Sequence, residues 1–96
     1  MNVARRDLGE ETLHELSEVL RESIEVGLAN RRRAMAYAMQ FGRGLDKTRT
    51  DRFVGMYVND LTLDYGERGR EAVRRLLADA QAAGLLPKPV TVEFAA

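Results

Sequence analysis

The sequence contains no cysteine, which excludes disulfides, thiolate nucleophiles and cysteine-ligated metal sites. It has no run near the roughly 18 consecutive apolar residues that a membrane-spanning helix needs. The beginning, MNVARRD, also lacks the apolar core of a signal peptide. Nothing in the sequence directs the chain to a membrane or to another compartment, so we expect a cytoplasmic protein.

Neither sign of charge is in excess, because 15 basic residues balance 15 acidic ones. The charges are unevenly placed, however, with a net −4 over residues 1–30, +5 over residues 31–52 and −1 over residues 53–96. Strong nucleic-acid affinity rests on many contacts between basic side chains and phosphates. A chain with no net charge is not expected to bind nucleic acid regardless of sequence. Only the basic residues 31–52 leave nucleic-acid binding open.

Length and composition indicate one small domain or a piece of a larger one. The 96 residues are 45% hydrophobic, 31% charged and 6% aromatic, as in ordinary helical proteins. A chain of this length buries only about 60–65% of the surface that its unfolded form exposes. We therefore expect no deep cleft with walls of its own.

The spacing of apolar residues predicts four helices, so the chain as it stands is mostly α. A stripe with spacings of three and four defines the first helix, at residues 10–29: Leu13, Leu16, Leu20, Ile24 and Leu28. Shorter stripes predict helices at about 31–41, 48–59 and 67–83. Asn30 is expected to end the first helix, and Gly84 with Pro87 to end the fourth.

Residues 90–94 alternate apolar and polar side chains, which predicts a short C-terminal strand. A single strand leaves its backbone hydrogen-bonding groups unpaired. We therefore expect residues 1–96 to be one segment of a larger protein whose sheet pairs with this strand. A homo-oligomer that buries the exposed helix faces is the other way to cover the apolar stripes.

The only histidine, His14, lies among acidic residues. Glu11 and His14 copy one half of a di-iron carboxylate site, and His14 with Glu18 resembles part of a zinc-protease motif. Both motifs are incomplete, since the first needs a second such pair and the second another histidine. We interpret these side chains as a solvated acidic face, and expect no metal and no catalytic residue here.

Three short segments that contain threonine or glycine resemble parts of functional motifs, but helix ends explain them better. Residues 46–50, DKTRT, come close to the phosphorylation loop of cation-pumping ATPases, but Arg49 stands in place of a required glycine. Asp46 or Thr48 as the cap of the third helix explains the segment better. The glycine segments at 42–44 and 66–69 are each too short for a dinucleotide-binding fingerprint, and no cofactor is expected.

The triplet Arg31, Arg32 and Arg33 begins a predicted helix, followed by a turn and a second helix. That order is reminiscent of helix-turn-helix DNA binding. The turn at 42–45 is loose and rich in glycine, however, and three arginines at a helix start oppose the helix dipole. A solvated or ion-paired face is the preferred interpretation, with DNA binding as the exception.

Residues 53–69, FVGMYVNDLTLDYGERG, are the most distinctive stretch of the sequence. With ARRDLGE at 4–10 and AVRRL at 72–76, they resemble the futalosine-pathway enzymes of menaquinone biosynthesis. The resemblance is strongest to the 1,4-dihydroxy-6-naphthoate synthase branch, and weaker to the chorismate dehydratase branch. It covers nearly the whole chain, but only the last third of a family member.

The resemblance implies a two-lobed α/β fold similar to type II periplasmic binding proteins, and a lyase acting on cyclic dehypoxanthinyl futalosine. The family's catalytic histidine and substrate contacts lie in the lobes, so a small-molecule ligand would bind there and this chain alone would be inactive. No position here matches them, and Tyr57, Asn59 and Asp64 are left without an assigned role. We expect Asn59 to cap the third helix and Gly66 to open the fourth.

Two other functions stay open at this point. A solute-binding protein would have the same fold and hold its ligand without chemistry. A free-standing helical interaction or DNA-binding module would instead fold on its own.

Overall fold

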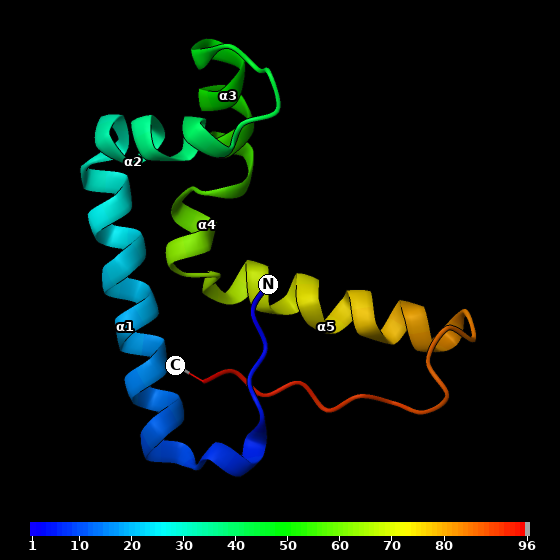
Figure 1. Cartoon of the computed structure of the whole chain (residues 1–96). Helices are drawn as coiled ribbons and strands as arrows, with labels where there is room; N and C mark the ends of the chain where they lie inside the picture. Colours follow the sequence, from blue (N-terminus) through cyan, green and yellow to red (C-terminus); the bar gives the residue numbers. More distant parts are fainter. Residues whose placement is uncertain (96) are drawn as a thin grey trace.

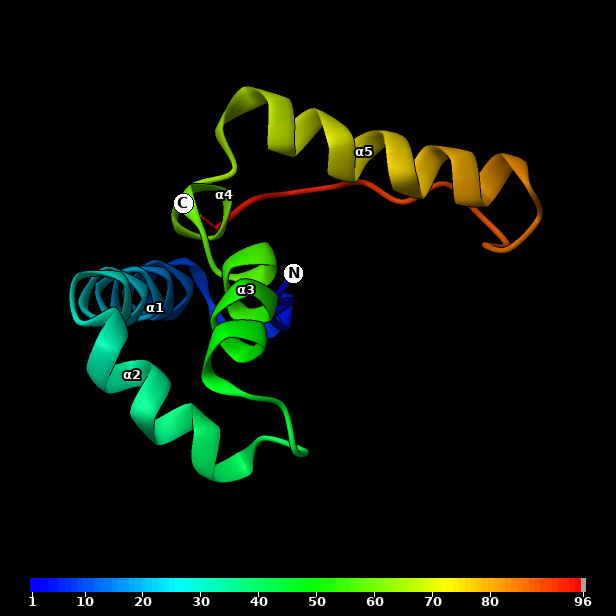
Figure 2. The ribbon, with the colours of Figure 1, turned by 90° about the horizontal axis from the view of Figure 1, so that it is seen from above.

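The computed structural model describes residues 1–95, which are mostly helical (Figure 1). The α-helices are α1 (Glu10–Ala29), α2 (Arg31–Ala38), α3 (Lys47–Tyr57), α4 (Asp60–Leu63) and α5 (Gly66–Ala82), with 3-10 turns η1 (Arg6–Leu8) and η2 (Met39–Phe41). Helix α4 lies alongside α1, whereas α5 projects away from the other helices (Figures 1 and 2). None of these helices, within residues 1–95, is long and apolar enough to cross a membrane.

The helices are arranged in an open shape with almost no core. The radius of gyration is 16.5 Å, whereas a compact domain of this length has one of about 12.5 Å. The solvent-accessible surface is 8468 Å², against about 5,500 Å² for a compact protein of this mass. Met35, at 4% exposure, is the only buried apolar residue among residues 1–95. The apolar stripes that form these helices are therefore only partly covered.

Helix α1 has the bounds that its apolar stripe predicts, 10–29. Along the stripe, Leu13, Ile24 and Leu28 are half-buried. Between them, Leu16 is 43% exposed and Leu20 is 46% exposed. Asn30 ends the helix as expected, because its side-chain amide donates to the carbonyl of Val26 at 2.9 Å.

Helices α2 and α3 are joined by an ion pair. The Arg31 guanidinium donates to the Asp51 carboxylate and to the Asp51 carbonyl, both at 2.9 Å. Arg31 and Met35 both line a small apolar groove of about 160 Å³, to which α1 and α3 also contribute residues. The second predicted helix, at 31–41, corresponds to α2 followed by η2.

The region after α3 departs from the sequence prediction. The third helix was expected to reach Asn59, but α3 ends at Tyr57 and a separate four-residue helix, α4, follows. The reason is a capping box at Asn59, in which Asn59 and Thr62 exchange side-chain and backbone hydrogen bonds. Such a pair starts a new helix at Asn59 and so prevents α3 from continuing through it.

The chain's last part forms an elongated unit, residues 66–95, that we call the arm. Gly84, with a φ of 77°, ends α5 as predicted, and the Leu85 amide donates back to the Ala80 carbonyl at 2.9 Å. The chain then returns along α5 in extended form (Figures 1 and 2). Near its end the ring of Phe94 contacts Tyr65 edge-on, with ring centroids 6.2 Å apart.

The strand predicted at residues 90–94 is not formed within residues 1–95. These residues are extended (Figure 1), and residues 91–94 alternate between exposed and half-buried, but no second strand in the described chain pairs with them. The described chain supplies no sheet edge, and a strand cannot form without a partner for its backbone groups. Instead, Arg6 ties this segment to the start of the chain, through an ion pair with Glu93 and a 3.1 Å hydrogen bond to the Thr91 carbonyl.

Candidate functional site

The distinctive stretch at 53–69 forms the junction between α3, α4 and α5, and it is built from side-chain caps. Asn59 lies at its centre. The Asn59 carboxamide oxygen accepts from the Leu61 amide at 3.0 Å and so starts α4. Its amide nitrogen donates to the carbonyls of Gly55 and Met56, both at 3.3 Å, and so closes the end of α3. The expectation that Asn59 caps the third helix is confirmed, and it also caps the next one.

Thr62 and Asp64 continue the same system of caps. The Thr62 hydroxyl donates to the Tyr57 carbonyl at 2.8 Å and accepts from the Asn59 amide at 3.1 Å. The Asp64 carboxylate accepts from the Gly66 amide at 2.9 Å, at the first residue of α5. Gly66 has a φ of 58°, a conformation that glycine adopts without strain, and it opens the last helix as expected. The Thr62 hydroxyl and the Asp64 carboxylate are therefore already hydrogen-bonded to backbone groups.

The two tyrosines of the junction differ in surroundings. Tyr57 is 65% exposed and its ring contacts Phe53, with centroids 5.0 Å apart. Tyr65 is half-buried and carries the edge-on contact to Phe94. The contacts of Thr62, Tyr65 and Phe94 were not predicted from the sequence. For Thr62 the signal was present, because a threonine three residues after an asparagine has the spacing of a capping box.

The junction should therefore matter for stability, and Asn59→Ala is expected to lower the free energy of unfolding by about 1–2 kcal/mol, because a helix start loses its cap. The stability of Asn59→Asp should lie between that of the parent and that of Asn59→Ala. Its carboxylate still accepts from the Leu61 amide, but it cannot donate to the carbonyls at the end of α3. The measurement is unfolding by a chemical denaturant, carried out on a larger folded protein into which this chain has been inserted. If the alanine variant is as stable as the parent, the capping role is wrong.

His14 lies on the exposed side of α1, with 65% of its side chain accessible. Its Nε2 is 3.5 Å from the Glu18 carboxylate, one helical turn on. Within residues 1–95, the structure gathers no group of three His, Asp or Glu side chains that could hold a metal ion.

Asp46 begins α3, as the sequence indicated. Its carboxylate accepts from the Arg49 backbone amide at 2.8 Å, which is the N-cap geometry. The Thr50 hydroxyl donates to the Asp46 carbonyl at 2.8 Å. The segment 46–50 is therefore a helix start, and its aspartate is already bonded within the helix.

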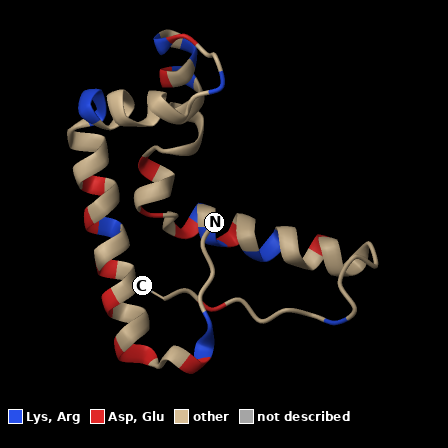
Figure 3. Ribbon diagram, viewed as in Figure 1, with Lys and Arg blue, Asp and Glu red and all other residues tan. Residues whose placement is uncertain are grey.

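The three consecutive arginines lie at the start of α2 (Figure 3), and their surroundings differ. Arg31 is directed inward and pairs with Asp51, whereas Arg32 and Arg33 are exposed. Arg31 also fills the space beside Gly55, where a Cβ would lie 3.0 Å from the guanidinium. One of the three cations proposed for DNA contacts thus has a structural role between α2 and α3.

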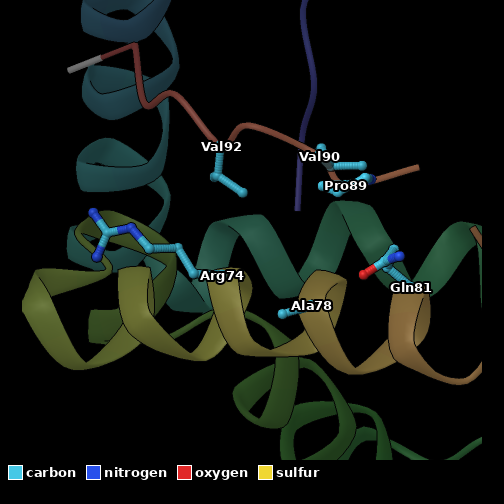
Figure 4. A pocket seen from close by; sticks show the side chains of 6 residues that line it. All are labelled: Arg74, Ala78, Gln81, Pro89, Val90 and Val92. Atoms are coloured by element: carbon cyan, nitrogen blue, oxygen red, sulfur yellow. The ribbon is translucent and has the colours of Figure 1, made fainter.

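A shallow hollow of about 280 Å³ lies between α5 and the returning chain (Figure 4). It is lined by Arg74, Ala78, Gln81, Pro89, Val90 and Val92. The only charged group, Arg74, is 3.2 Å from the Glu67 carboxylate and lies 5.5 Å from the centre of the Phe94 ring. The hollow therefore offers a small apolar surface without a free acid or base.

Comparison with known proteins identifies relatives over nearly the whole chain. The profile of a family described as menaquinone biosynthesis matches residues 1–82. A 1,4-dihydroxy-6-naphthoate synthase from Streptomyces coelicolor is 36% identical over 85 residues, which are 88% of this chain and 30% of the relative. A second such synthase, from Thermus thermophilus, is 40% identical over 93 residues, which are 94% of this chain and 34% of the relative.

The chain spans about a third of the length of these two curated relatives. No solved structure matches it significantly. The family profile covers most of the chain, and both relatives are more than 30% identical to it. The chain therefore belongs to the menaquinone biosynthesis family.

Proposed function

We propose that the chain is part of a futalosine-pathway enzyme of the 1,4-dihydroxy-6-naphthoate synthase type, a lyase that acts on cyclic dehypoxanthinyl futalosine. One observation carries the proposal, the identity of 36% and 40% to two such synthases over 88% and 94% of the chain. In this proposal the chain supplies helices that support the enzyme. The reacting groups come from parts of the protein that match no residue here.

The whole protein, in the same proposal, has the two-lobed α/β fold of type II periplasmic binding proteins. Two observations support it. The open arrangement of the helices leaves about 2,900 Å² more surface accessible than a compact chain of this mass would. Residues 90–94 are extended, and residues 91–94 alternate between exposed and half-buried, as the residues of a strand with one covered face do.

A chimera tests this function directly. The 93-residue stretch of the Thermus thermophilus synthase that aligns with this chain would be exchanged for the chain itself. We expect the chimera to convert cyclic dehypoxanthinyl futalosine to the naphthoate product, as followed by liquid chromatography. The control is the same synthase with a glycine–serine linker in place of the stretch, which should be inactive. A chimera that unfolds as cooperatively as the parent enzyme but gives no product would contradict the proposal.

A further inference from the structure

We draw no further inference here: the strongest candidate, the apolar surface patch on α2 and η2 where the exposed rings of Tyr37 and Phe41 lie together, carries nothing because no feature of the described residues 1–95 shows what covers it.

Discussion

Heating the purified 96-residue chain on its own is expected to melt its helices gradually, without a cooperative transition. Cooperative unfolding requires a shared core, and Met35 is the only buried apolar side chain in the described chain. Isolated helices of 8 to 20 residues, the lengths of α2 and α1, are marginal in water without tertiary packing. The exposed stripes on α1 and α5 should also bind a hydrophobic dye.

Far-UV circular dichroism follows the loss of helix on heating, and scanning calorimetry measures the heat that unfolding absorbs. A compact domain of 96 residues absorbs about 65 kcal/mol at its midpoint, and the chain alone should show no such peak. The matched control is the covalent chimera, in which the same helices are covered and should melt together. A sharp peak of the full size from the isolated chain would show that the helices form a core by themselves, as a free-standing module would.

The isolated chain should also convert no cyclic dehypoxanthinyl futalosine. Its single histidine is 65% exposed and lies beside Glu18. The hollow between α5 and the returning chain, about 280 Å³, has one charged group that is already paired. Substrate sites are typically enclosed pockets of about 300–1,000 Å³ with several polar groups directed inward. Turnover by the isolated chain is therefore expected to lie below the detection limit of an assay in which the chimera is active.

The assay is product formation at enzyme concentrations that saturate the signal of the chimera. His14→Ala serves as the control, since it removes the only histidine and loses only its exposed contact with Glu18. Turnover by the isolated chain that disappears in His14→Ala would contradict the account, because the chemistry would then lie within these 96 residues.

The sequence predicted the long helices well because their determinants are local. The bounds of α1 follow from a five-residue apolar stripe, and the end of α5 from Gly84 and the proline beyond it. Helix α4 was missed, because a four-residue helix has no periodicity to detect and depends on the caps at Asn59 and Thr62. The alternation at 90–94 was recognised, but whether such a segment forms a strand depends on a neighbour outside its own sequence.

The candidate site was harder to predict than the helices. The stretch at 53–69 is recognisable as a family feature, yet its polar residues could equally have been directed into a cleft or toward backbone. Only the distances decide: the side-chain oxygens and nitrogen of Asn59, Thr62 and Asp64 lie within 3.3 Å of backbone groups. The inward position of Arg31 was likewise beyond local sequence rules, because its partner Asp51 is 20 residues away.

Hydrogen–deuterium exchange of the backbone amides in α5 tests the central claim most directly, namely that these helices depend on a body outside the 96 residues. The account predicts that these amides exchange rapidly in the isolated chain and become strongly protected in the covalent chimera. Protection of α5 in the isolated chain equal to that in the chimera would contradict it, because the helix would then be stable without any partner.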